Sequence, residues 1–185
     1  MLRRLGVMGF AFAVAISSFA AAQDPQEKHV DIQSSAGDLH VGTDADARKA
    51  GLPLYPGARL TRDEDNRNAV NLGILTEAFG MKLVVAKYES DDPPAKIIDF
   101  YREQLKKYGK VLECHTRDHG EHADFDDDEN SKELKCEGDN TGPVTELKVG
   151  RQKNQHVVAI EPKEGHSGST FALVYVRARG KQGDI

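Results

Sequence analysis

The segment SDDPPAKIIDFYREQLKKYG, residues 90–109, carries the clearest structural pattern in the chain. Asp91 or Asp92 can cap a helix, Pro93 stands where a missing N–H costs nothing, and Gly109 suits a left-handed stop. Apolar side chains recur between these signals at intervals of three and four: Ile97, Ile98, Tyr101, Leu105 and Tyr108. This spacing predicts one amphipathic helix over residues 93–108, with its apolar stripe against a core.

Alternating and β-branched residues indicate strands on both sides of this helix. Two are predicted before it and five after it, over residues 69–78, 81–88, 110–116, 132–137, 144–151, 155–161 and 170–177. Short loops between successive strands favour antiparallel pairing. The predicted fold class is α+β, an antiparallel sheet of about six or seven strands covered by one main helix (93–108).

Residues 1–22 are predicted to be a secretory signal peptide. Arg3 and Arg4 precede an apolar run of 12 residues from Leu5 to Ile16, and Ala20-Ala21-Ala22 supplies the small residues that a signal peptidase needs. A helix that spans a membrane requires about 20 apolar residues, so a retained anchor is not expected. We therefore expect a periplasmic or extracellular protein that begins at Gln23 after cleavage and has no stable membrane anchor.

Removal of the signal peptide leaves 163 residues, enough for one ordinary domain. Residues 23–46 are polar and show no sustained period, so we expect a flexible leader there. A single α+β domain is predicted over 47–178, and a disordered tail over 179–185.

Charge narrows the choice of partners. The formal net charge is −5, and it becomes −7 when Arg3 and Arg4 leave with the signal peptide. A negative protein is poorly suited to bind nucleic acid or an anionic membrane. The expected partner is an unknown protein or envelope component.

The two cysteines, Cys114 and Cys136, are predicted to form a disulfide. They are an even number in an exported chain, whose compartment is oxidising. Closing a loop between positions 22 apart contributes roughly 3 kcal/mol by the loop-entropy estimate. The closed segment has few apolar residues, so a covalent link is useful there.

The segment between these cysteines is the chemically unusual part of the chain. Residues 113–139 contain 11 acidic and 3 basic residues. His115, His119 and His122 are spaced by four and three, so on a helix they could share a face and bind zinc, nickel or copper. Asp118 and Asp124 are further candidate ligands. His115 follows Cys114 at a predicted strand end, which disturbs that helical geometry.

Two other readings of the segment stay open. Asp126, Asp128, Asn130 and Glu137 match positions 1, 3, 5 and 12 of a calcium loop, but Ser131 stands where glycine is required. The simpler reading is a solvated acidic loop, held at its base by the disulfide. No cofactor is expected, and any divalent metal is expected to bind weakly because the loop offers little rigidity.

Two parts of the sequence resemble a known pattern. The run Leu52-Pro53-Leu54-Tyr55-Pro56-Gly57-Ala58 is followed by Tyr88-Glu89-Ser90-Asp91-Asp92-Pro93, then by Phe100-Tyr101, Leu105 and Gly109. This YPGA turn and Asp-Pro capped helix resemble a pattern in uncharacterised small exported bacterial proteins, over roughly Gly51 to Arg177. The resemblance implies a common fold and a bacterial envelope protein, and it brings no functional residues with it.

Catalytic signatures are weak. Gly165-His166-Ser167-Gly168 is the nearest approach to a nucleophile elbow, but Ser169 replaces the second glycine and the segment joins two predicted strands. Glycine-rich phosphate loops are absent from the sequence. The chain is interpreted as an exported, non-enzymatic envelope or extracellular module that binds an unknown partner. The alternatives are transition-metal binding through the acidic segment His115 to His122, and a small hydrolase with an unrecognised site.

Overall fold

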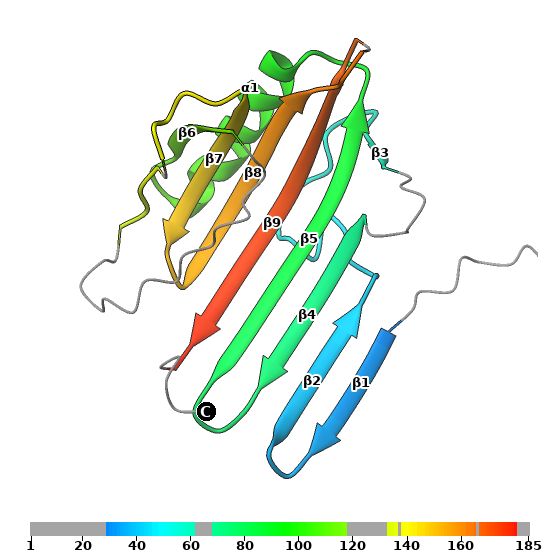
Figure 1. The fold of residues 1–185 in the computed structure, drawn as a ribbon, viewed down its shortest axis with the longest axis vertical. Coiled ribbons are helices and arrows are strands. Elements are labelled where there is room, and N and C mark those ends of the chain that lie inside the picture. Colours follow the sequence, from blue (N-terminus) through cyan, green and yellow to red (C-terminus); the bar gives the residue numbers. More distant parts are fainter. Residues whose placement is uncertain (1–28, 62–67, 118–132, 137, 166, 181–185) are drawn as a thin grey trace, which may run out of the picture.

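The computed structural model describes residues 29–61, 68–117, 133–136, 138–165 and 167–180. Within these residues the chain forms one antiparallel sheet of nine strands and one α-helix, which confirms the predicted α+β class (Figure 1). The strand order is β1-β2-β4-β5-β9-β8-β7-β6, and β3 pairs with β5. The elements are β1 (His29–Ser34), β2 (Gly37–Gly42), β3 (Arg59–Leu60), β4 (Ala69–Leu75), β5 (Gly80–Ser90), α1 (Pro94–Leu105), η1 (Lys106–Tyr108), β6 (Leu112–Thr116), β7 (Val144–Arg151), β8 (Asn154–Pro162) and β9 (Ser169–Arg179).

The predicted helix is present, with different capping. It begins at Pro94, and no side chain caps it, so neither predicted aspartate plays that role. Asp92 instead accepts a hydrogen bond from the Tyr55 hydroxyl at 2.9 Å. The helix ends at Leu105 and continues as a 3-10 turn up to Gly109, whose φ of 135° is easily adopted only by glycine. The fully buried stripe is Ile97, Tyr101 and Leu105, whereas Ile98 is only partly buried.

The core lies between one face of the sheet and two covering segments. The helix α1 packs on β7 and β8, and the connection over residues 43–58 lies behind β5 and β9 in the view of Figure 1. We call this covered side the inner face. It includes the cross-strand row Ala86, Leu173, Val158 and Leu147, all with no exposed surface. The opposite side is called the outer face.

Tyrosine hydroxyl groups fasten the 43–58 connection to this core. The Tyr101 hydroxyl accepts a hydrogen bond from the Tyr55 N–H and donates one to the Pro53 carbonyl, both at 3.2 Å. The Tyr88 hydroxyl accepts the Ala47 N–H at 2.9 Å. Because these hydroxyl groups pair with the backbone of Ala47, Pro53 and Tyr55, parts of a segment with little regular structure can be buried. The YPGA turn noted in the sequence therefore serves the packing of the core.

The sheet is larger than predicted. Residues 29–42, placed by sequence in a flexible leader, form the hairpin β1–β2, and β3 is a further short strand. Residues 133–136, predicted as part of a strand, are not in one, and β6 is left as an edge strand paired only with β7 among the described residues. Strand β9 extends to Arg179, into the predicted tail.

Several sequence predictions lie outside the described residues. They include the signal peptide over 1–22, the first residues of the leader up to 28, and the end of the tail over 181–185. No helix of the described residues is long and apolar enough to cross a membrane.

Candidate functional site

Of the five predicted metal ligands, the structure describes one. His115 lies on β6, opposite Thr145 of β7, with its side chain 44% exposed and its Nε2 3.9 Å from Oε1 of Glu113. The other four predicted ligands, Asp118, His119, His122 and Asp124, lie outside the described residues. Within the described ranges, no three His, Cys, Asp or Glu side chains are grouped as a metal site. Metal binding by this segment therefore stays a prediction.

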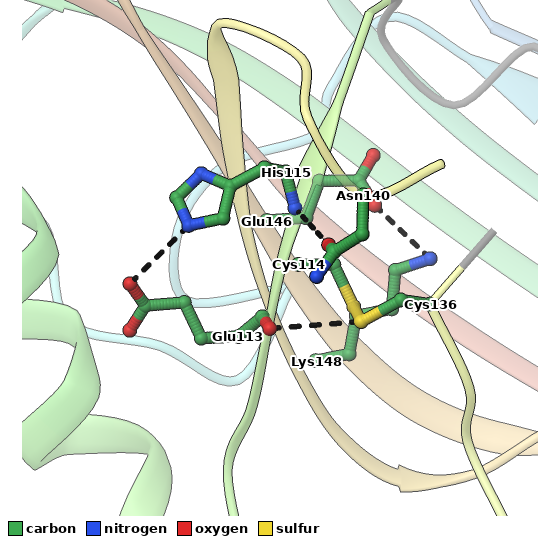
Figure 2. The surroundings of a disulfide bond; sticks show 7 residues. All are labelled: Glu113, Cys114, His115, Cys136, Asn140, Glu146 and Lys148. Carbon is green, nitrogen blue, oxygen red and sulfur yellow. Dashed lines mark hydrogen bonds and ion pairs between the residues drawn. A yellow bond between two sulfur atoms is a disulfide. The ribbon is translucent and has the colours of Figure 1, made fainter. Parts of the chain in front are cut away.

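The predicted disulfide between Cys114 and Cys136 is present (Figure 2). Cys114 is fully buried on the outer face of β6, and the two Cα atoms are 5.3 Å apart. Polar contacts reinforce this edge: the His115 N–H donates to Oδ1 of Asn140 at 2.6 Å, and Arg117 pairs with Asp139 at 2.5 Å. The base of the acidic segment is thus closed by a covalent bond and by contacts on either side of it.

A buried ion pair lies beside the disulfide on β7. Lys148 Nζ is 3.0 Å from Oε2 of Glu146, and both side chains are more than nine-tenths buried. Removing one partner of such a pair leaves an uncompensated charge, which is strongly destabilising. Figure 2 shows both residues close to the sulfur atoms. We assign the pair a structural role at this edge, because Glu146 is the direct cross-strand partner of Cys114.

A groove with both apolar and charged lining residues lies beyond the end of the core, and its charged residues are on the inner face. It has a volume of about 750 Å³ and is lined by β1, β2, β4, β5 and β9. The inner-face row that crosses it contains, from β9 to β1, Arg177, Lys82, Gly73, His40 and Asp31. Cations therefore form one wall and a His–Asp pair the other. No Ser, Thr or Cys side chain is among the described residues that line the groove.

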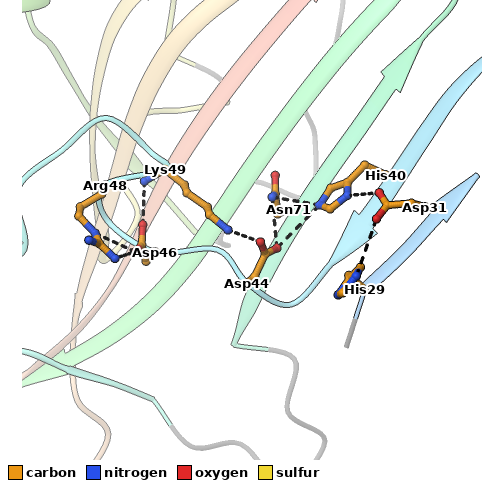
Figure 3. A network of polar contacts seen from close by, with 8 residues as sticks. All are labelled: His29, Asp31, His40, Asp44, Asp46, Arg48, Lys49 and Asn71. Atoms are coloured by element: carbon orange, nitrogen blue, oxygen red, sulfur yellow. Dashed lines mark hydrogen bonds and ion pairs between the residues drawn. The ribbon is translucent and has the colours of Figure 1, made fainter. Parts of the chain in front are cut away.

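The His40 imidazole is held on both nitrogens (Figure 3). Its Nδ1 lies 2.6 Å from Oδ1 of Asp31, and its Nε2 lies 3.2 Å from Nδ2 of Asn71. Because the Asn71 amide nitrogen donates to Nε2, the neutral ring carries its proton on Nδ1 and donates it to Asp31. The contacts on both nitrogens hold the imidazole in one orientation, in which it forms one wall of the groove.

The network continues from His40 into the 43–58 connection. The Asn71 amide also donates to Oδ1 of Asp44 at 3.2 Å, and Asp44 accepts from the Lys49 ammonium. The hydrogen bond from Lys49 lowers the pKa of Asp44, although partial burial opposes the shift. Asp46 accepts the Lys49 N–H at 2.7 Å. These contacts join the β1–β2 hairpin to the segment that covers the core.

The outer face of the same strands has the opposite character. Within β1, β2, β4, β5 and β9, three consecutive cross-strand rows contain only apolar side chains. They are Val30, Val41, Leu72, Leu83 and Val176; Ile32, Leu39, Ile74, Met81 and Ala178; and Val70, Val85 and Val174. Beyond β9 the first row continues with Gln155 on β8, and the third continues with Val157 on β8 and Lys148 on β7.

No described element covers this apolar part of the outer face, which Figure 1 shows as the side without a helix. Val30, Ile32, Val41 and Val70 are 56%, 52%, 40% and 36% exposed. At about 4.8 Å between strands and about 6.8 Å between alternate residues, five strands and three rows span about 19 by 14 Å between backbone centres. With the side chains that extend beyond these centres, the area approaches that of the largest apolar patches on monomeric proteins, which are often functional.

Neither the groove nor the apolar rows were identified from the sequence. The signal for the strands was present, because Val30, Ile32, Leu39 and Val41 alternate with polar residues on either side of a Ser34 to Gly37 turn. The faces could not be assigned, because a period of two does not say which side is covered. Gly165 to Gly168, considered above as a nucleophile elbow, connect β8 and β9, and His166 lies outside the described residues.

Comparison with known proteins supplies no relative for this arrangement: no protein-family model, no curated protein and no solved structure matches the chain.

Proposed function

We propose that this chain is an exported, non-enzymatic envelope or extracellular module, and that it binds a partner protein through the apolar rows of its outer face. The observation that carries the proposal is the uninterrupted run of apolar side chains across β1, β2, β4, β5 and β9. Burying apolar surface is the main favourable term in protein association. A flat sheet face of this kind is complementary to another sheet or to the apolar stripe of a helix.

The rest of the chain offers little to cover that face. By sequence, seven of residues 118–132 are acidic and Phe125 is the one large apolar side chain among them. Residues 23–28 are Gln, Asp, Pro, Gln, Glu and Lys. Once residues 1–22 are removed by the proposed cleavage, the mature chain has no further apolar segment of matching size outside the described residues. The complementary surface is therefore expected to come from another molecule.

The proposal can be tested by photocrosslinking in cells. A benzoylphenylalanine residue at Val70, on the outer face, is expected to give one adduct of defined mass with an envelope protein. The same residue at Lys82, on the inner face of the neighbouring strand, is the matched control and should not give this adduct. An adduct at twice the mass of the chain would identify the partner as a second copy.

A variant checks that the adduct reflects apolar binding. Val41→Lys introduces a charge at an exposed position of the rows and should abolish the Val70 adduct without lowering the melting temperature appreciably. Equal crosslinking from Val70 and Lys82, or no adduct from Val70, would contradict the proposal.

Amino-terminal sequencing of the exported protein tests the proposed localisation, since a chain that still contains Leu5 to Ile16 would contradict cleavage before Gln23.

A further inference from the structure

Three cationic side chains stand together on the inner face beyond the core. Lys82 on β5 is the direct cross-strand partner of Arg177 on β9, and Arg179 is the partner of Gly80. All three are exposed. Like charges directly opposite on one sheet face repel, and this repulsion destabilises the sheet. The position of Lys82 and Arg177 is therefore unfavourable unless another group offsets the charge.

Within the described residues, no carboxylate is in ion-pair contact with these cations. Lys82 Nζ lies 5.9 Å from the centroid of the Tyr175 ring, and Arg179 Nη2 donates to the Thr76 carbonyl at 3.4 Å. The nearest carboxylates of the His40 network have other partners, since Asp31 contacts His40 and Asp44 contacts Lys49. The positive charge is thus left facing the groove in a protein whose net charge is −5.

Space for a ligand lies next to the cations. Gly73 separates Lys82 from His40 in the same row, and a Cβ atom at Gly73 would meet only the His40 Cβ, at 3.6 Å. Lys82 and His40 lie on the two strands that flank β4, about 10 Å apart as two strand spacings require, and Gly73 places no side chain between them. This gap opens into the groove of about 750 Å³.

We propose that this groove binds a small oxyanion, a phosphate or carboxylate group, at the Lys82–Arg177 pair. A guanidinium group donates two parallel hydrogen bonds to such a group, and the ammonium adds a third. The anion occupies the gap above Gly73, between the cationic wall and the fixed His40 wall. Asp31 and Asp38 on the far side of the groove select a ligand that carries its negative charge at one end. Lys82 and Arg177 lie on the inner face, although Ile32, Leu39, Ile74 and Met81 of the apolar rows also contribute to the lining of the groove.

Calorimetric titration of the mature protein at low ionic strength tests the proposal, with inorganic phosphate and acetate as the two probes. One probe is expected to bind saturably, one ion per chain, and the tighter of the two identifies the group recognised. Lys82→Gln removes one charge-assisted hydrogen bond and should weaken binding by about tenfold, and Arg177→Gln removes two and should weaken it by more. Lys87→Gln is the control, because Lys87 is an exposed cation of the same strand on the opposite face, and it should change nothing.

A second variant separates binding from folding. Lys82→Glu should abolish binding and yet raise the melting temperature at low salt, because it replaces a like-charge cross-strand pair by an opposite-charge pair. Absence of saturable binding for both probes would overturn the proposal. So would an equal loss of affinity in the Lys87→Gln control, which would indicate nonspecific attraction.

Discussion

The two halves of the sheet, one covered by α1 and the other formed by β1, β2 and β4, place their apolar side chains on opposite faces. Around α1, the inner face is apolar and closed, as in the row Ala86, Leu173, Val158 and Leu147. In the half formed by β1, β2 and β4, the inner face carries His40 and Asn71, and the apolar side chains point outward. An antiparallel sheet normally presents one apolar face to one core. This reversal is the feature on which the proposed binding of a partner rests.

The largest expected difference between the halves is in the cost of truncating a leucine. Leu105 of α1 has no exposed surface, so Leu105→Ala should lower the free energy of unfolding by about 2 to 5 kcal/mol. Leu72 of β4 is partly exposed on the outer face, and Leu72→Ala should cost only about 1 kcal/mol or less. Urea denaturation at low protein concentration measures both. Equal losses would contradict the comparison and show that the outer face is already covered in the isolated chain.

The disulfide at the β6 edge should contribute to the free energy of unfolding, and the β1 edge of the other half has no such link among the described residues. At the β6 edge, replacing both Cys114 and Cys136 by serine should lower the free energy of unfolding by about 3 kcal/mol, since the loop is no longer closed in the unfolded chain. Denaturation with and without reductant provides the control, because reduced wild-type protein should match the double variant. A double variant as stable as the oxidised protein would mean that the contacts of Asn140 and Asp139 alone hold this edge.

A smaller effect is expected at the boundary between the halves, where His156 lies between the rings of Tyr108 and Tyr175. Burial lowers the pKa of His156, and the Lys107 ammonium lowers it further. The unfolded chain binds a proton near pH 6.5 and the folded chain only at lower pH, so stability should fall as the pH drops below about 6.5 and level off below the folded pKa.

Two variants test whether His156 causes this pH dependence of stability. His156→Phe keeps a ring in the stack and does not titrate, so its melting temperature should lack this component of the pH dependence. Lys107→Gln should reduce the same component, because the folded pKa then moves toward the unfolded value. Thermal denaturation between about pH 5 and 8 measures the three slopes around the reference histidine pKa. An unchanged slope in His156→Phe would assign the pH dependence to other groups.

The parts of the fold that follow from local pattern were predictable. Ile97, Tyr101 and Leu105 form a stripe with a helical period, and the two cysteines have one intramolecular pairing available. The hairpin β1–β2 was missed because its polar residues outnumber its apolar ones, although Val30 and Ile32 alternate as strand residues do.

The groove could not be predicted because it is a product of strand order. Asp31 and Arg179, near opposite ends of the chain, line the same cavity only because β9 inserts beside β5. Likewise, no sequence pattern indicates that the sheet extends past its helix, since that depends on how many strands join it. Of the predicted metal ligands the structure describes only His115, and metal binding by the other four stays a prediction.

The bond between Cys114 and Cys136 affects which insertions this chain can tolerate, in evolution or in engineering. It joins the two ends of the intervening segment at the sheet edge, so insertions there need not disturb the register of β6 and β7. Each doubling of a flexible loop costs only about 0.6 kcal/mol in closure entropy. The position is therefore a site where new sequence can be acquired or grafted, such as an epitope or a small binding motif, while the domain stays folded.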